Sequence, residues 1–301
     1  MLNNGLVQPH RLRILLELSR LGSMREVADE LGTTTSSVSQ HIAALAVEVG
    51  SALVEPEGRR VRLTPAGRRL AGHAVTILAA VDAARRDLDP HEEPRGVVRV
   101  AGFASAIRRS LLPVVAEISR THPGIDVRLS EYEPLEAVNL LGRDDIDLAL
   151  VYDYNLAPIT LRSDMSSTEL WSMPWGVGVA SPARPAPFAS YADSDWIVNS
   201  RNTADEDALR TLASMAGFTP RIVHRIDSLE LVEELIVASQ GIGLLPQGRT
   251  MRRGVRVLPL TDPPVVLRAY TATRHGREQW APLRVLLEHL RDESTAAPVR
   301  G

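Results

Sequence analysis

Residues 23–67 read SMREVADELGTTTSSVSQHIAALAVEVGSALVEPEGRRVRLTPAG. This stretch predicts a helix, a tight turn, a second helix, a short basic hairpin and the start of another helix. Gly32 lies at the turn, where a left-handed backbone is easily adopted only by glycine. Val38 and Ile42 are four residues apart and can share one buried face with Val27. Helices at 9–21, 24–31 and 35–47 and hairpin strands at 52–55 and 60–63 together predict a winged helix-turn-helix.

The second helix of the motif presents a polar face that is almost uncharged. Short polar side chains of this kind hydrogen-bond to base edges and phosphates. Gln40 can form a paired contact with adenine, worth about 1–3 kcal/mol of discrimination. The alternative is a solvent-exposed polar helix without a DNA partner. The predicted DNA contacts on this face are Thr34, Thr35, Ser36, Ser39, Gln40 and His41.

Composition and charge narrow the class of protein. The 301 residues are 44% hydrophobic, which suits two or three folded domains. The absence of cysteine excludes a disulfide framework, a thiolate zinc site and a cysteine nucleophile. The net charge is −3, yet residues 59–69 hold five arginines and no acidic residue. This basic stripe suits phosphate contact, and Arg59 and Arg60 are the predicted wing contacts; an ordinary charged hairpin tip is the alternative.

The sequence gives no sign of export or membrane insertion. The N-terminal residues MLNNGLVQPHRLR lack an apolar core followed by a cleavage site. The longest apolar runs fall far short of the roughly 20 residues that cross a bilayer. We therefore expect a soluble, cytoplasmic protein without a membrane partner.

A long helix is predicted after the hairpin. Thr64 suits its N-cap and Pro65 its first position, and the helix should run to about Leu88. Apolar residues repeat every seven positions in two series, as in a coiled-coil contact between two chains. A stripe that packs on its own domain is the alternative. The predicted dimerisation residues are Leu70, Ala74, Ile77, Val81, Ala84 and Leu88.

Strands and helices alternate beyond a polar, proline-bearing hinge at residues 90–96. This alternation predicts a doubly wound α/β sheet followed by a second α/β lobe. The first set has strands at 97–101, 126–130 and 147–152, with helices at 107–120, kinked at Pro113, and 135–141. The second set has strands at 176–180, 196–199, 222–225, 242–245 and 265–273, with helices at 206–216, 229–239 and 278–291.

With these elements in order, the chain resembles the LysR-type transcriptional regulators over nearly its whole length. The most specific segment is 34–67, followed by the long helix. LLPVVAEISRTHPGIDVRLSE at 111–131, DDIDLALVY at 144–152 and GIGLLP at 241–246 follow in the family's order. The chain departs from the family where Val54 and Pro56 replace a usual Phe and Arg, and where Thr35-Ser36 replaces a common Gln-Pro.

The resemblance implies an α/β protein with an N-terminal winged helix-turn-helix, a long linker helix that dimerises and a two-lobed effector domain like the periplasmic binding proteins. It implies double-stranded DNA and a small-molecule effector as partners, a homodimer or homotetramer, RNA polymerase as a further candidate partner, and no cofactor. The implied domains are 1–63, a linker helix at 64–89, a hinge at 90–96 and an effector domain at 97–301, with lobe one at 97–161 and 269–295 and lobe two at 162–268.

An effector site is expected beyond the carboxyl ends of the strands, where open α/β folds bind ligands. The helix opened by Ala104-Ser105 can offer free N–H groups to an anion. Arg201 can hold a carboxylate with two hydrogen bonds, so we expect a small carboxylate or aromatic acid as effector. The alternatives are helix caps for Ser105 and Ser228, a surface ion pair for Arg201 and packing for Tyr152. The predicted effector residues are Ala104, Ser105, Tyr152, Asp153, Asn199, Ser200, Arg201 and Ser228.

Motifs of common enzyme classes are missing from the sequence. There is no HExxH, G-x-S-x-G or P-loop, and the eight histidines lack metal-ligand spacing. We therefore expect a ligand-responsive DNA-binding regulator, with no catalytic residue and no metal. An enzyme with an accessory winged helix is the alternative, and a free solute-binding protein would need an export signal.

Overall fold

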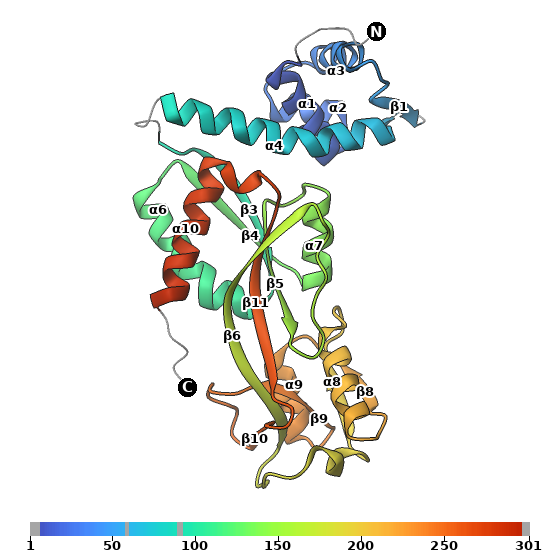
Figure 1. Cartoon of the computed structure of the whole chain (residues 1–301), viewed down its shortest axis with the longest axis vertical. Coiled ribbons are helices and arrows are strands. Elements are labelled where there is room, and N and C mark those ends of the chain that lie inside the picture. The colour runs from blue at the N-terminus through green and yellow to red at the C-terminus, as the bar shows by residue number, and fades with distance from the viewer. Residues whose placement is uncertain (1–6, 58–59, 89–92, 297–301) are drawn as a thin grey trace.

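The structure of the chain, a computed structural model, describes residues 7–57, 60–88 and 93–296. Figure 1 shows a helical N-terminal domain, a long helix that runs across it, and an elongated α/β domain. The N-terminal elements are α1 (Pro9–Leu21), α2 (Met24–Glu30), α3 (Thr35–Val49), β1 (Val54–Glu57), β2 (Arg60–Leu63) and the long helix α4 (Pro65–Leu88).

The α/β domain begins after the hinge. Its strands are β3 (Gly96–Gly102), β4 (Ile125–Glu131), β5 (Leu148–Tyr154), β6 (Met165–Ala180), β7 (Asp195–Val198), β8 (Arg221–Arg225), β9 (Ile242–Pro246), β10 (Val255–Pro259) and β11 (Val265–Arg274). Its helices are α5 (Ala104–Ala106), the π-helical η1 (Ile107–Leu111), α6 (Leu112–Thr121), α7 (Pro134–Gly142), the 3₁₀ helix η2 (Phe188–Tyr191), α8 (Ala204–Met215), α9 (Leu229–Val237), the 3₁₀ helix η3 (Arg277–Gln279) and α10 (Ala281–Ala296).

Hydroxyl caps and a glycine turn set the limits of the N-terminal helices. The Ser23 hydroxyl accepts a hydrogen bond from the N–H of Glu26 at 3.4 Å, and that of Thr34 accepts one from the N–H of Ser37 at 3.1 Å. Gly32 has a φ of +61°, as the predicted turn requires. The helix-turn-helix is therefore confirmed, with its second helix slightly longer than expected.

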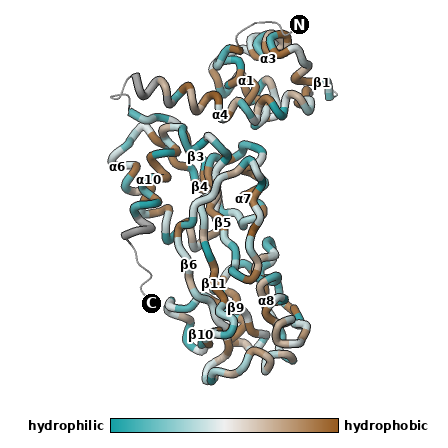
Figure 2. The backbone as a smooth tube through the Cα atoms, in the orientation of Figure 1, coloured by the Kyte–Doolittle hydropathy of each residue, from teal (hydrophilic) through white to brown (hydrophobic). Residues whose placement is uncertain are grey.

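One hydrophobic core holds the N-terminal domain together. Val27, Val38 and Ile42 are all buried in it, as their spacing predicted. Burying a side chain of this size contributes about 1.5–3 kcal/mol. Helices α1 and α4 complete the core, and Figure 2 shows hydrophobic and hydrophilic segments alternating along α4.

The hairpin is joined to α4 by a single threonine. The Thr64 hydroxyl accepts a hydrogen bond from the N–H of Gly67 at 3.0 Å and donates one to the carbonyl oxygen of Ala52 at 2.7 Å. This side chain therefore caps α4 and fixes the base of the wing at once. The turn expected at 56–59 is wrong at its first two residues, because Pro56 and Glu57 belong to β1 and pair with β2.

The heptad pattern of α4 is divided between two environments. Ala74 is fully buried and Leu70 packs on the same N-terminal core, because α4 lies against α1. Ala74 has no surface left for a partner, so the expectation that it faces one is wrong, whereas Leu70 is half-buried and stays a predicted dimerisation residue. Ile77 (41% exposed), Val81 and Ala84 remain predicted dimerisation residues, and the side chain of Leu88 lies outside the described residues.

A single mixed sheet of nine strands forms the α/β domain. Eight strands follow the order β4-β3-β5-β11-β6-β9-β7-β8, and β10 pairs with β6. The sets β4-β3-β5 and β8-β7-β9 are parallel, whereas β11 and β6 pair antiparallel with their neighbours. The predicted α/β architecture is confirmed, with two antiparallel strands joining its parallel halves.

Strands β6 and β11 run alongside each other through the middle of this domain (Figure 1). They pair from Met165 opposite Arg274 to Trp175 opposite Val265, and β6 then pairs with β9 and β10. Residues 165–175 and the whole of β10 were not predicted as strand. The first boundary expected between the lobes, at residue 162, lies just before β6, and the second, at residue 268, lies inside β11. These lobe boundaries stay a prediction.

Helices cover both faces of the first half of the sheet. Leu148, Leu150 and Tyr152 of β5 face the core that α6 and α10 close, and Ala149 and Val151 face α7. All seven residues of β5 are buried, which explains its continuous apolar run. The kink expected at Pro113 takes the form of the π-helical segment that precedes α6. Among the described helices, none is both long and apolar enough to cross a membrane.

Two glycines of α4 offer a matched test of the contact between the wing and this helix. A Cβ at Gly67 would overlap the carbonyl oxygen of Leu53, whereas one at Gly72 would meet only the end of the Arg274 side chain at 3.0 Å. Gly67→Ala should therefore destabilise the N-terminal domain by about 1–3 kcal/mol or more, despite the better helix propensity of alanine. Gly72→Ala should be neutral or stabilising; thermal unfolding of both variants checks this, and equal melting temperatures would contradict it.

Candidate functional site

The exposed face of α3 is the first candidate site. Thr35, Ser36, Ser39 and Gln40 are exposed, and their side chains form no hydrogen bond within the part of the chain that the structure describes. Thr34 is also exposed, but its hydroxyl serves as the helix cap. This face is therefore a row of free donors and acceptors on a rigid helix, which is the chemistry that major-groove recognition needs.

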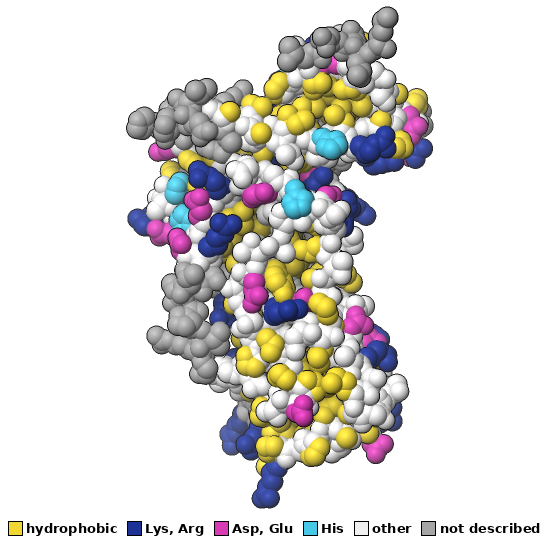
Figure 3. Space-filling model, in the orientation of Figure 1, with side chains coloured by type: hydrophobic (Ala, Val, Ile, Leu, Met, Phe, Trp, Pro, Cys, Tyr) yellow, Lys and Arg dark blue, Asp and Glu magenta, His cyan; other side chains and the backbone are white. Residues whose placement is uncertain are grey.

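His41 is placed differently from the expectation. It is half-buried, and its ring packs edge-on against that of His10 of α1, with ring centres 5.0 Å apart. Arg59 and the side chain of Arg60 lie outside the described residues, so the wing contacts stay a prediction. Figure 3 shows arginine side chains gathered at the end of the N-terminal domain that holds β1. Arg62, Arg68 and Arg69 are exposed there.

A cavity of about 350 Å³ is the second candidate site. It opens between the helices that follow β3 and the strand ends of β7 and β9, and we call it the interlobe cavity. A cavity of this size accommodates a small organic molecule. Its apolar walls come from Phe103, Trp175, Ile197, Val198, Ile226, Leu229, Val232, Leu244 and Leu267, and its charged residues are Arg108, Glu131, Glu133, Arg201, Asp205, Asp227, Glu230 and Arg249.

Most of the predicted effector residues meet at this cavity. Ala104, Ser105, Tyr152, Asn199, Arg201 and Ser228 all line it. Asp153 does not, because successive side chains of a strand point to opposite faces of the sheet. Its carboxylate is paired with Arg268, with Oδ1 at 2.9 Å from Nε. Ser200 does not line the cavity either, since its hydroxyl donates to Asp227 at 2.5 Å.

Two of the lining residues have structural partners that account for them. The Ser228 hydroxyl accepts a hydrogen bond from the N–H of Leu231 at 3.3 Å, so it caps α9. The Arg201 guanidinium lies 2.9 Å from Asp227 and 3.6 Å from Glu136. The expectation of a carboxylate effector depended on a free Arg201, and this side chain is already shared among carboxylates.

Glu133 is the most deeply placed charged group of the cavity. Only 6% of it is exposed, and its Oε2 accepts hydrogen bonds from the Tyr152 hydroxyl at 3.1 Å and from the Asn199 amide at 3.3 Å. The nearest cation is Arg201, 4.0 Å from Oε1. The backbone N–H of Glu133 in turn donates to Glu136 at 3.0 Å, so the first turn of α7 holds this residue in place.

The cavity shifts the pKa values of its buried acids upwards. Burial raises the pKa of Glu133 to about 7; Asp205 and Asp227 act in the same direction, and the Tyr152 hydroxyl and Arg201 oppose it. Burial also raises the pKa of Asp205 to about 6. Partial burial would raise the pKa of Asp227, but hydrogen bonds from Ser200 and Arg201 outweigh it and lower that pKa.

The sequence did not point to Glu133, Asp205, Asp227 or Trp175. A usable signal existed for Glu133, because EPLE at 133–136 is an acidic cap directly after a strand, at the edge where ligands bind. Asp205 was interpreted only as part of the acidic first turn of α8. Trp175 lies in the part of β6 that was not predicted.

Comparison with known proteins decides the family. Residues 9–68 match the model of a bacterial regulatory helix-turn-helix protein of the lysR family, and residues 91–295 match that of the LysR substrate binding domain. The chain belongs to the LysR family. It is 26% identical to the transcriptional dual regulator GltC of Bacillus subtilis over 267 residues, which cover 85% of this chain and 87% of that protein.

Solved structures of LysR regulators share the whole fold. Full-length OxyR of Pseudomonas aeruginosa matches with a TM-score of 0.71 at 17% identity, over 98% of this chain and 100% of that one. Full-length LysG of Corynebacterium glutamicum with bound effector Arg matches with a TM-score of 0.63 at 20% identity, over 96% and 98%. The chain is thus a LysR-type transcriptional regulator with a DNA-binding domain and an effector-binding domain, as the sequence predicted.

The raised pKa of Glu133 predicts a pH-dependent stability. A carboxyl whose pKa is higher in the folded than in the unfolded state loses stability as the pH rises between the two values, here from about 4.5 to about 7. Glu133→Gln removes this loss, so it should stabilise the ligand-free protein at pH 8 by roughly 1–3 kcal/mol and have little effect at pH 4.5. Melting temperatures at both pH values measure the difference.

Glu117→Gln is the matched control for this prediction. Glu117 is an exposed carboxylate on α6 whose pKa is lowered by its hydrogen bond with Arg120. It is therefore ionised throughout the range from pH 5 to 8, and its replacement should give no pH-dependent change there. A constant difference between Glu133→Gln and wild type across this range would show that burial does not shift the pKa of Glu133.

Proposed function

We propose that this LysR-family regulator reads a specific DNA sequence with α3 and the wing, as a dimer or a dimer of dimers. The observation that carries the proposal is the row of exposed hydroxyl and amide groups on α3 without partners in the described structure. The positive end of the wing supports it, because arginines beside a recognition helix bind phosphates in any sequence. Binding of two recognition helices would need an inverted repeat in the DNA.

The regulatory signal is proposed to be a small molecule in the interlobe cavity. Two ion pairs join the lobes at its rim: Arg108 of η1 with Glu230 of α9 at 3.4 Å, and Arg201 with Glu136 of α7 at 3.6 Å. Exposed ion pairs of this kind contribute at most about 1 kcal/mol each, so a bound ligand can readily change the closure of the lobes. The change in closure would then alter the spacing of the DNA-binding domains.

The proposed regulator performs no catalysis, in keeping with relatives that are transcriptional regulators. It is proposed to act in the cytoplasm, where its DNA is found. Contact with RNA polymerase is part of the proposed mechanism. Because the chain has no cysteine, its signal cannot be the oxidation of a thiol.

Binding to the DNA upstream of its own gene tests this function. Fluorescence anisotropy with that DNA and with unrelated DNA, at about 150 mM salt where non-specific binding is weak, should give tight binding only to the first. A screen of genomic fragments extends the test to distant sites. Equal, weak binding to every fragment would contradict the proposal.

Gln40 is expected to contribute to base selection. Gln40→Ala should weaken binding to the selected DNA by about 1–3 kcal/mol, roughly five- to hundredfold, and leave binding to unrelated DNA unchanged. Gln240→Ala, which removes an exposed glutamine of the effector domain, is the control and should change neither. If Gln40→Ala weakens both kinds of binding equally, α3 does not select bases through this residue.

Arg59 is expected to contact a phosphate. Each such contact adds about one unit to the slope of log K against log salt concentration, so Arg59→Ala should lower that slope by about one. Arg128→Ala, on the exposed surface of β4, should leave it unchanged. A series of anisotropy titrations between 50 and about 200 mM salt measures both slopes, and identical slopes for Arg59→Ala and wild type would mean that the wing tip does not touch DNA.

A further inference from the structure

The interlobe cavity carries more negative than positive charge. Five carboxylates and three arginines line it, an excess of two negative charges when all are ionised. The carboxylates come from β4, the start of α7, the start of α8, the segment before α9 and the first turn of α9, so they surround the space rather than lie on one helix. These carboxylates are Glu131, Glu133, Asp205, Asp227 and Glu230.

Each of the three arginines already has a carboxylate partner. Arg108 pairs with Glu230 at 3.4 Å, and Arg249 pairs with the buried Glu233 behind the cavity wall. Arg201 lies within 4.0 Å of four carboxylates, and its single positive charge cannot neutralise all of them. Within the described residues, no arginine or histidine forms an ion pair with Asp205. A positively charged ligand would therefore balance the charge of the cavity, and a negatively charged ligand would increase the imbalance.

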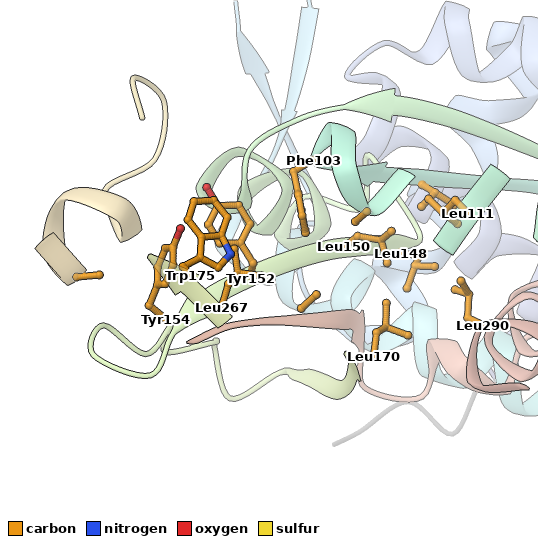
Figure 4. Packing of buried hydrophobic residues seen from close by; sticks show 14 of the residues in the cluster. Phe103, Leu111, Leu148, Leu150, Tyr152, Tyr154, Leu170, Trp175, Leu267 and Leu290 are labelled. Carbon is orange, nitrogen blue, oxygen red and sulfur yellow. The ribbon is translucent and has the colours of Figure 1, made fainter. Parts of the chain in front are cut away.

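Aromatic rings and enclosed polar atoms give an independent sign of a ligand. The rings of Phe103, Tyr152, Tyr154 and Trp175 form a continuous series, with 4.7, 6.1 and 5.4 Å between successive ring centres (Figure 4). Phe103, Tyr152 and Trp175 line the cavity, and Tyr154 packs against the last two. Trp175 lines the cavity with only 6% exposed, yet its Nε1 has no hydrogen-bond partner among the described residues. Asp205 Oδ1 also lies on the cavity wall without a hydrogen bond of good geometry among the described residues, and the Tyr154 hydroxyl beside this carboxyl only partly offsets the effect of burial on its pKa. Buried polar atoms without partners are costly unless a ligand completes them. The carboxylate oxygen needs a donor, which an ammonium group supplies, whereas the indole N–H needs an acceptor elsewhere on the ligand.

We propose that the effector is an organic cation, with an ammonium or guanidinium group held by Glu133 and Asp205 and an apolar body packed on the aromatic wall around Trp175. Carboxylates supply the charge that such a group needs, and the faces of aromatic rings attract cations as well. The apolar walls would bury the rest of the molecule. This inference rests on the proposed function, since it names the class of ligand that the same cavity binds.

The ionisation of the two acids adds a pH signature to the inference. The pKa values of about 7 for Glu133 and about 6 for Asp205 leave part of the site neutral in the absence of a ligand. A bound cation favours the ionised forms, so its affinity should rise between pH 5.5 and 8. The charged and titratable groups that face Glu133 are Tyr152 of β5, Arg201 after β7, Asp205 of α8 and Asp227 after β8.

Two pairs of probes with the same body and opposite charge test the inference on the full chain. 2-Phenylethylamine is compared with 3-phenylpropanoate, and 3-methylbutylamine with 4-methylpentanoate, by isothermal titration calorimetry at pH 5.5 and pH 8. We expect at least one amine to bind, at least tenfold more tightly than its matched acid, and more tightly at pH 8. Binding of the acids alone, or of none of the four probes, would overturn the inference.

Three variants separate a cation site from an anion site. Glu133→Gln and Asp205→Asn keep the shape of the side chains and should each weaken amine binding at least tenfold, whereas Glu117→Gln on α6 should have no effect. Arg201→Gln should tighten amine binding, because it removes a competing positive charge. Loss of binding in Arg201→Gln would instead mean that the guanidinium holds the ligand, and would overturn the inference even if the other two variants failed to fold.

DNA binding without any probe distinguishes this inference from the function on which it rests. Each variant is measured by anisotropy on the selected DNA in the absence of amines and acids. Selective DNA binding together with preference for the acids would refute only the cation site. Failure of the wild-type protein to select any DNA would refute the proposed function itself.

Discussion

The antiparallel pairing of β6 with β11 is the constraint on which the effector domain depends. It joins two parallel sets of strands that would otherwise form separate sheets. Trp175 lies on β6 where the pairing passes from one set to the other, and Leu267 lies on β11 beside Tyr154 of β5. Both side chains line the cavity. The floor of the cavity is therefore part of a continuous hydrogen-bonded sheet, whereas its rim consists of helix starts and loops that can move.

The charged groups of the cavity are of two kinds, buried acids and exposed ion pairs at the rim. Glu133 is held by Tyr152 and Asn199 and is buried, so its ionisation responds strongly to any charge that enters the cavity. The ion pairs of Arg108 and Arg201 across the rim are more exposed and weaker. A ligand that neutralises the buried acids also competes for the carboxylates that hold Arg201. Under the proposed function, binding and lobe closure would therefore be linked through the same few charges.

The sequence was informative where structure is decided locally. Gly32 and Thr64 each set a helix limit through neighbours a few residues away, and both were interpreted correctly. Thr34 sets the start of α3 in the same way, but it was predicted only as a DNA contact. The first half of β6 could not be predicted in this way, because its polar residues form a strand only through pairing with β11, about a hundred residues later in the chain.

The candidate site was predicted in place but not in chemistry. Strand ends pointed to the correct edge of the sheet, and six of the eight expected residues line the cavity. The prediction for Asp153 was wrong, because the end of a strand can be located from the sequence but the face of the sheet to which a given side chain points cannot. The charge around Arg201 could not be predicted for a different reason: it depends on the carboxylates at 131, 133, 136 and 227, which only the fold brings around this side chain.

The two faces of α4 show how the signal can reach the DNA-binding domain. One face, with Ala74, is part of the N-terminal core, and on another the Thr76 hydroxyl donates to the carbonyl oxygen of His275 at 3.0 Å, just beyond β11. The same helix thus contacts both the recognition domain and the strand that forms the cavity floor. Since the first half of α4 is occupied on these sides, a partner chain has Ile77 and the residues after it to pack against. In the proposed mechanism, a helix held at one end by its own domain and at the other by a second chain would turn a shift at β11 into a change in the spacing of two recognition helices.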